Sequence, residues 1–293
     1  SILSALIYAA HKANDMSTGQ LDLFAQMNDQ NVKPNYVNCM DWSDKVRLYN
    51  EKQLLGLYLS GHPIDAYRME LIQYCGDVTL NNMIPGAPDS PNLITVGAVV
   101  NNAFQRISSK DGNKFYTMTL DDGTGTFDIM LFGKNAEIYA DIEKKMNENR
   151  KKKKSANADD INAPLILIVT GYLSMTDEGM MKLRVKEIHT LESLRVLKAR
   201  KITLNFTSKL FDDNIMFIDE VLMRNRVDVK EVNRELRQAE DPDSIIKGCT
   251  LNIIIDNKLL CIRDDKFRFV PRDDLVEGIR DRAGAESVRI GYV

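Results

Sequence analysis

The chain has 293 residues, a formal net charge of −3 at pH 7, and 28% charged residues. This length is enough for about two or three domains with sizeable cores. The small net charge excludes a strong overall attraction to nucleic acid. Residues 96–195 hold 15 basic and 14 acidic residues, the only third of the chain with a positive excess. Any nucleic-acid binding must therefore depend on local patches of charge.

Cysteine usage indicates a cytoplasmic protein with reduced thiols. The four cysteines are scattered, form no C-x-x-C pair and have no histidine near them: Cys39, Cys75, Cys249 and Cys261. We therefore expect no metal site and no cofactor. No apolar run approaches the ~20 residues of a membrane span, and no signal peptide is visible. The chain enters a helical pattern directly after Ser1, so we expect it to be part of a longer polypeptide.

The first amphipathic helix is predicted over residues 2–14, and turn formers follow it. A short segment without helical periodicity comes next: Gln20, Leu21, Asp22, Leu23 and Phe24. An extended peptide of this kind can insert Leu23 and Phe24 into an apolar pocket while Gln20 hydrogen-bonds at the rim. On chemistry alone, packing of these side chains on the local core remains the alternative.

A second helix is predicted to begin after Trp42, with Asp41 or Ser43 as its N-cap, and to end at residues 60–63. His62 at this end is interpreted as structural, because no nucleophile or carboxylate partner is suggested nearby. A third helix is predicted over residues 65–75. Three prolines in seven residues then indicate a linker at 85–91.

Five strands are predicted between residues 93 and 190. The first three are 93–100, 114–122 and 125–132, and two more lie on either side of the turn at 176–179. Gly123 and Gly125 follow the second strand, where a tight turn needs positive φ. Three strands, a helix over 136–146 and two strands are the order of the five-stranded OB-fold barrel, whose usual ligands are single-stranded nucleic acids or saccharides.

Basic and aromatic side chains alternate around the predicted loop at 101–113. This pattern favours a single-strand-binding surface, because cations contact phosphates and rings stack on bases. By alternation only one of Phe115 and Tyr116 faces outward, and the other faces the core. Side chains of the fourth and fifth strands can extend the same face. The candidate residues are Phe104, Arg106, Lys110, Asn113, Lys114, Phe115, Tyr172, Lys182 and Arg184.

A basic segment at about 146–163 separates the predicted helix from the fourth strand. Its run of Arg150 and four lysines is typical of a solvated loop, and it can alternatively add phosphate contacts.

The last third is predicted to be mixed α and β. Strands are expected at 199–207, around 256–258 and 264–266, and at the C-terminus, with helices at 219–239 and 271–283. A helix on a sheet is the simplest arrangement. Three acidic pairs suggest metal catalysis, but hairpin turns and helix first turns favour acids in any case. The pairs are Asp212-Asp213, Asp264-Asp265 and Asp273-Asp274.

Two segments resemble a known family. Gln20–Phe24 is similar to the bacterial sliding-clamp-binding motif at every position. Glu51–Ile64, EKQLLGLYLSGHPI, resembles the run that precedes the OB domain in the bacterial DNA polymerase III alpha subunit. The order of motifs resembles the last quarter of that subunit. The basic segment at 146–163 departs from the family pattern and resembles an insertion.

The resemblance implies an α+β multidomain chain: a helical segment with the clamp motif (1–90), an OB-fold domain (91–196) and a small α+β domain (197–293). The implied partners are the sliding clamp (beta subunit), single-stranded template DNA, the clamp-loader tau subunit and the remainder of the alpha subunit. The family's polymerising carboxylates lie in a palm domain, which nothing here resembles, so we expect this chain alone not to synthesise DNA.

Two other classes of protein compete with this interpretation. A free-standing single-stranded nucleic-acid-binding protein would share the barrel. An enzyme in its own right would need a catalytic cluster, and no phosphate-binding G-x-x-x-x-G-K-[ST] motif or His-rich motif is present.

Overall fold

The computed structural model describes residues 42–109, 112–136, 138–139, 142–146, 164–238, 245–262 and 266–292. The chain divides into two compact units, residues 1–47 and 48–293. The predicted helix at 2–14, the segment Gln20–Phe24, Lys110 and residues 147–163 of the basic insertion lie outside the described residues. No helix among the described residues is long and apolar enough to cross a membrane.

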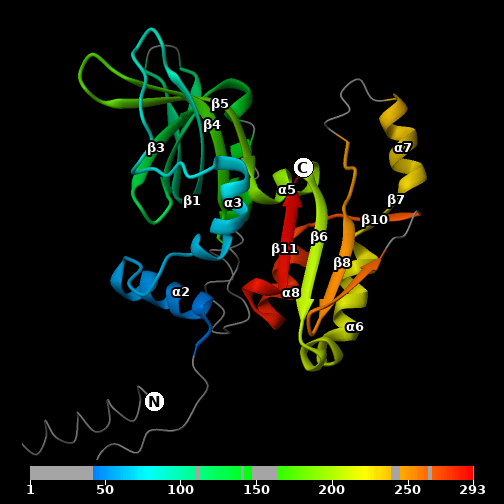
Figure 1. The fold of residues 1–293 in the computed structure, drawn as a ribbon. Coiled ribbons are helices and arrows are strands. Elements are labelled where there is room, and N and C mark those ends of the chain that lie inside the picture. The colour runs from blue at the N-terminus through cyan, green and yellow to red at the C-terminus, as the bar shows by residue number, and fades with distance from the viewer. Residues whose placement is uncertain are drawn as a thin grey trace, which may run out of the picture. The chain divides into compact units, whose positions relative to one another are not determined.

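The second unit begins with short helices that lead into the barrel (Figure 1). They are α2 (Asp44–Leu55), which begins in the first unit, η1 (Asp65–Tyr67) and α3 (Arg68–Cys75). The backbone N–H of Val46 donates to the Ser43 hydroxyl, which caps α2 as predicted. The prediction that this helix continues to residue 60 is wrong. It ends at Leu55 because Gly56 takes a φ of 76°, a left-handed conformation that terminates helices.

Five antiparallel strands form the predicted OB-fold barrel in the order β3-β2-β1-β4-β5. Strand β3 also contacts β5, which closes the sheet. The core is built from the inward-facing, mostly aliphatic residues of these strands. The bounds are β1 Asn92–Ile107, β2 Lys114–Asp121, β3 Thr126–Leu131, β4 Ile166–Met175 and β5 Met181–Thr190.

The segment at residues 77–91 packs on the barrel. Leu80 and Met83 are buried in the barrel core. The backbone of Gly86 donates to Leu173 and accepts from Met175, along the edge of β4. The linker predicted at 85–91 connects α3 to the barrel and is fixed to the sheet at Gly86.

His62 holds the polypeptide against the β2–β3 turn. Its Nδ1 accepts from the Ile64 backbone N–H at 3.3 Å, and its Nε2 lies 3.3 Å from Oδ1 of Asp121. Burial lowers the pKa of His62, although the charge of Asp121 opposes this shift. Gly123 has a φ of 79°, and a Cβ there would lie 3.0 Å from the His62 ring. The expectation that His62 has no carboxylate partner is wrong, since Asp121 lies beside it, but the imidazole packs against the turn and has a structural role there.

The C-terminal part is a four-stranded sheet in the order β11-β6-β8-β9, in which β6 and β8 are parallel. Helices α6 and α8 pack on one face of the sheet and complete its core. A two-stranded ribbon pairs β7 with β10. The bounds are α5 Leu191–Lys198, β6 Ala199–Phe206, α6 Ser208–Arg224, β7 Arg226–Asp228, α7 Val229–Gln238, β8 Thr250–Ile255, β9 Lys258–Ile262, β10 Phe267–Phe269, α8 Asp273–Ala283 and β11 Val288–Tyr292.

One helix predicted in this part is wrong. Instead of a single helix over 219–239, α6 begins at Ser208, where the Thr207 side chain accepts from the Leu210 N–H as N-cap. It ends before Asn225, and β7 separates it from α7. Asp212 and Asp213 therefore lie in α6 and not in a hairpin turn. Asp273 and Asp274 lie in the first turn of α8 as predicted.

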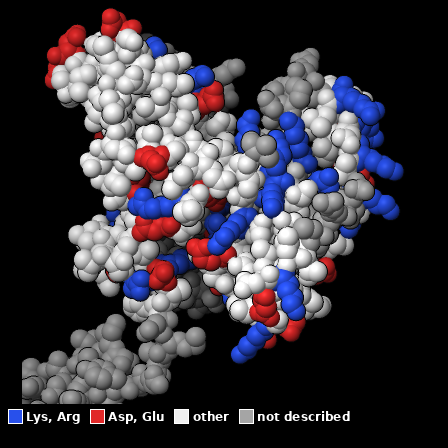
Figure 2. Space-filling model, viewed as in Figure 1, with Lys and Arg blue, Asp and Glu red and all other residues white. Residues whose placement is uncertain are grey.

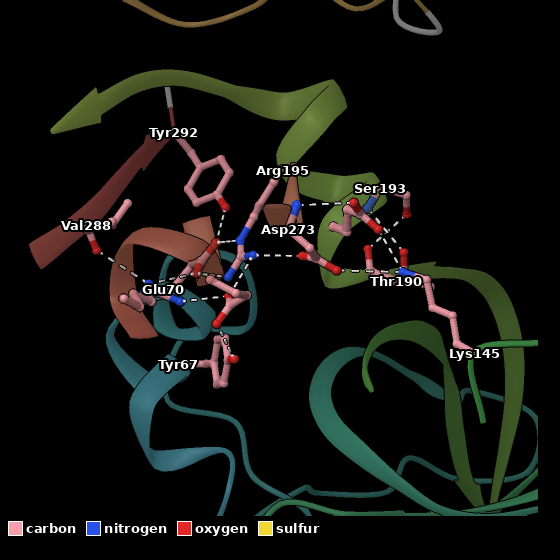
Figure 3. A network of polar contacts seen from close by, with 12 residues as sticks. Tyr67, Glu70, Lys145, Thr190, Ser193, Arg195, Asp273, Val288 and Tyr292 are labelled. Carbon is pink, nitrogen blue, oxygen red and sulfur yellow. Dashed lines mark hydrogen bonds and ion pairs between the residues drawn. The ribbon is translucent and has the colours of Figure 1, made fainter. Parts of the chain in front are cut away.

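A buried network centred on Arg195 joins the barrel to the C-terminal sheet (Figure 3). Arg195 follows the last barrel strand in α5 and is 1% exposed. Its guanidinium donates to both oxygens of Glu70 in α3, at 2.8 and 2.9 Å. It also donates to Asp273 and Glu277 of α8, each at 3.2 Å. One side chain thereby connects three segments that lie more than 70 residues apart in the sequence.

Further groups complete the network. The Tyr67 hydroxyl donates to Glu277 at 2.8 Å, and its ring lies 5.8 Å from Arg195 and 5.2 Å from Arg280. The Tyr292 hydroxyl donates to Glu70. Burial alone raises the pKa of Glu70, but the hydrogen bonds and charge of Arg195 outweigh it and hold that pKa below its usual value. Glu70 is therefore a carboxylate stabilised by its partners.

Replacement of Arg195 by Met should lower the free energy of unfolding by about 3–5 kcal/mol, because it leaves the buried Glu70 carboxylate without its bidentate guanidinium partner. Lys145→Met is the matched control. Its pair with Glu192 spans 2.7 Å but is partly exposed, so a loss of about 1 kcal/mol or less is expected. Urea unfolding measures both. Equal losses in the two variants would contradict the central role of Arg195, and Arg195→Met/Glu70→Gln should recover part of the loss.

The network also predicts a pH dependence. Burial and the negative charge of Glu192 raise the pKa of Asp273 to about 6, against the opposing charges of Arg195 and Lys145. A carboxyl with a higher pKa in the folded chain binds its proton more tightly there, so the free energy of unfolding falls as pH rises through this range. Asp273→Asn should flatten that fall between about pH 4.5 and pH 7 in urea titrations. An unchanged slope would assign the pH dependence to other groups.

Candidate nucleic-acid interface

The candidate interface is the outer face of β1, β2 and β3. In an antiparallel sheet, residues that pair across two strands point to the same face. Arg106 pairs with Phe115, Phe104 with Thr117, and Thr117 with Met130. Met118 and Leu120 alternate with these β2 residues and are buried in the core. The outward set is therefore Phe104, Arg106, Phe115, Thr117 and Met130.

A β-bulge brings Phe104 and Arg106 to this face. Before the bulge the even-numbered residues Val96, Ala98 and Val100 point into the core. The register of β1 with β2 shifts between Val100 and Asn102. After this extra residue the odd-numbered Ala103 packs against the core and the even-numbered side chains point outward. The loop predicted at 101–113 is thus wrong for residues 101–107, which continue the strand.

Aromatic rings form the centre of the interface. Phe115 stacks on Phe132 with ring centroids 5.4 Å apart and an interplanar angle of 17°. Phe132 is 58% exposed and Phe104 is 52% exposed. The Arg106 guanidinium lies 5.9 Å from the centroid of the Phe104 ring. Tyr116 faces the other way and stacks on Tyr139 beside the core, so Phe115 is the outward member of the pair.

The other predicted residues are distributed over the barrel. Lys114 is exposed, but it shares a face with Tyr116 and not with Phe115. The Asn113 carbonyl accepts from the Ser108 N–H and closes the β1–β2 hairpin. Tyr172 pairs with Arg184, whose guanidinium lies 5.2 Å from the tyrosine ring, and Lys182 is exposed nearby on β5. This second group belongs to the β4–β5 hairpin, which pairs with the other half of β1.

Sequence reasoning missed Phe132 and Met130. Met130 lies near the end of β3 and Phe132 directly follows it. Apolar residues in a run such as FDIMLF are expected to fill a core. The signal that could have found them is strand alternation, since Ile129 and Leu131 are buried and their neighbours must point outward. No cluster of three or more His, Cys, Asp or Glu side chains that could hold a metal ion occurs in the described part of the chain.

Comparisons with known proteins agree with the barrel fold. Residues 94–191 match the family model of the OB-fold nucleic acid binding domain. Along its whole length the chain is 27% identical to the DNA polymerase III subunit alpha of Escherichia coli strain K12, of which it covers 22%. The corresponding subunit of Pasteurella multocida is 31% identical over 68% of the chain and 16% of that relative. The chain thus spans about a fifth of the length of these relatives.

Among solved structures, a domain of replication protein A from Methanococcus maripaludis matches 39% of this chain and 93% of that domain. The TM-score is 0.24 and the sequence identity 16%, values too low to support an inference.

Proposed function

Because the chain is homologous to the C-terminal part of the bacterial DNA polymerase III alpha subunit, we propose that it tethers such a polymerase to its template and to its replication partners. In this proposal the barrel binds single-stranded template DNA through the outer face of β1, β2 and β3. The tethering function needs no catalytic group in this chain. The observation that carries the proposal is the exposed Phe132 ring stacked on the half-buried Phe115.

The aromatic pair supports base stacking. Each base that stacks on a protein ring contributes about 1–3 kcal/mol, and stacking tolerates any base sequence. A template strand passes every sequence through the same site, so a sequence-tolerant contact suits this function. Phe132 keeps more than half of its surface exposed even while it stacks on Phe115, which leaves ring surface for a base.

Arg106 supports a phosphate contact next to the rings. It is exposed, lies across β1–β2 from Phe115 and extends along the Phe104 ring. An arginine in this position can bind a phosphate while the neighbouring rings hold bases. The Thr117 hydroxyl and the apolar Met130 side chain border the same face. The face therefore combines the two kinds of contact that single-strand binding requires.

The double substitution Phe115→Ala/Phe132→Ala should weaken binding of an oligothymidylate by about tenfold or more, because the stacking surface is removed. Fluorescence anisotropy of a labelled oligonucleotide measures the effect. The control Met216→Ala removes a side chain that is 83% exposed on α6 and should leave binding unchanged. Thermal melting checks that both variants fold. Full binding by the folded double variant would place the DNA contact elsewhere.

We also propose that Gln20–Phe24 binds the sliding clamp. The support is the match of this segment to the bacterial clamp-binding motif at every position, together with the homology of the chain. In this proposal Leu23 and Phe24 fill an apolar pocket of the clamp and Gln20 hydrogen-bonds at its rim.

Leu23→Ala/Phe24→Ala should abolish clamp binding by the chain, because the double substitution removes two buried apolar anchors of the interface. Surface-immobilised clamp provides the measurement, and Met27→Ala in the same segment is the control. Equal binding by the double variant and the wild type would refute the clamp assignment. It would favour the competing interpretation, a free single-stranded DNA-binding protein that is indifferent to the clamp.

The third partner in the proposal is the tau subunit of the clamp loader, which would dock on residues 197–293. This assignment rests on the family resemblance, which does not identify the contact residues. The remainder of the alpha subunit would supply the polymerising carboxylates.

A further inference from the structure

The four strands of the C-terminal sheet contain no acidic residues, and three of them contain basic ones. Their sequences are ARKITLNF, TLNIII, KLLCI and VRIGY. By contrast, residues 196–293 as a whole hold 18 basic and 18 acidic residues. In the described residues of this part, many of the acids lie on the helices that cover the other face: α6 carries Asp212, Asp213, Asp219 and Glu220, and α8 carries Asp273, Asp274, Glu277 and Asp281. The same helices also carry Lys209, Arg224, Arg280 and Arg282, so each helix has a net charge of −2 while the strands carry only positive charge.

Two of the basic residues point away from the helices. Lys201 alternates with Ile202, and Arg289 lies between Val288 and Ile290, and all three apolar neighbours are buried against α6 and α8. Both basic side chains are exposed, and Arg289 donates to the likewise exposed Glu286 at 3.4 Å, a surface contact that a phosphate would replace. Arg289 pairs with Thr203, and Lys201 pairs with Gly291, so the two charges lie on adjacent strands of one open face.

Small polar side chains border the two cations on β6 and at the start of β8, whereas the apolar Ile254 and Leu259 occupy the β9 side of the same face. Thr203 pairs with Asn252, and Lys201 pairs with Thr250, which places Thr203, Asn252 and Thr250 on the same face as the two cations. Asn205 follows two residues after Thr203 and is exposed. Figure 2, in the view of Figure 1, shows Lys and Arg gathered over the C-terminal half, whereas the barrel is mostly uncharged on this side.

We propose that the open face of strands β11, β6 and β8 binds the sugar–phosphate backbone of single-stranded DNA, as a second binding surface beyond the barrel. Lys201 and Arg289 neutralise phosphates, and the Thr and Asn side chains donate hydrogen bonds to phosphate oxygens. The face has few apolar groups on β6 and β11, so it suits backbone binding better than base stacking. The inference rests on the proposed function only in that it takes the same single-stranded DNA as the ligand.

Oligonucleotide length separates the two binding surfaces. A single OB-fold binds about 4–16 nucleotides, so an oligothymidylate of about 8 occupies the barrel and one of about 40 can also reach the sheet. Lys201→Glu/Arg289→Glu should weaken binding of the long oligonucleotide by about tenfold and reduce its salt slope by at least about 1.4, roughly 0.7 for each phosphate that the variant no longer neutralises. Binding of the short oligonucleotide should stay within about twofold of the wild type.

Controls make the outcome decisive. Lys209→Glu reverses an exposed charge on α6, on the helix-covered face, and is compared with Lys201→Glu alone. The proposal would be overturned if the two single variants weakened binding of the long oligonucleotide equally, or if the salt slope of the double variant were unchanged. An acidic protein would then be the remaining candidate partner for this face. The charge-reversed chain could misfold, so Lys201→Ala/Arg289→Ala is also measured. It should weaken binding of the long oligonucleotide in the same direction, by a smaller factor. Failure of the barrel proposal is recognised separately, by full binding of the short oligonucleotide to Phe115→Ala/Phe132→Ala.

Discussion

The buried contact between Arg195 and Glu70 is the interaction on which the arrangement of residues 48–293 depends. A guanidinium that is almost fully removed from water must have its charge and its donors satisfied, and here carboxylates from α3 and α8 do so. Desolvation costs several kcal/mol per ion in such a site, and only good geometry offsets it. The contact therefore contributes more to specificity than to net stability: it favours one relative placement of the barrel and the sheet.

The barrel face is set by a different constraint, the two-residue period of a strand. A single extra residue near Asn101 changes which side chains of β1 point outward, and this change places Phe104 and Arg106 beside Phe115 and Phe132. The candidate binding residues come from three strands and thus share one surface without any long loop. A rigid strand framework also reduces the side-chain ordering that binding would otherwise require.

Much of the architecture could be predicted from local sequence patterns. The succession of the five barrel strands along the chain and the β8–β9 turn followed from alternation and from turn residues such as Gly123 and Asp256-Asn257. The end of β1 could not be predicted, because the bulge interrupts the alternation and resembles the start of a loop. The Arg195 network could not be predicted from the sequence either, since Glu70 and Asp273 become neighbours only through tertiary packing. In the candidate site, Phe115 and Arg106 could be identified, whereas Phe132 required the register of β3 with β2.

The charge of the C-terminal sheet has a consequence for self-association. Strands β9 and β11 are the edges of this sheet, and Leu259 and Leu260 on β9 are each 56% exposed. Exposed edges of this kind invite strand addition by a second molecule. Here β9 is short and begins with Lys258, and β11 carries Arg289. Two copies that approached edge to edge would bring like charges together, so Lys258 and Arg289 disfavour pairing of two copies through these strands.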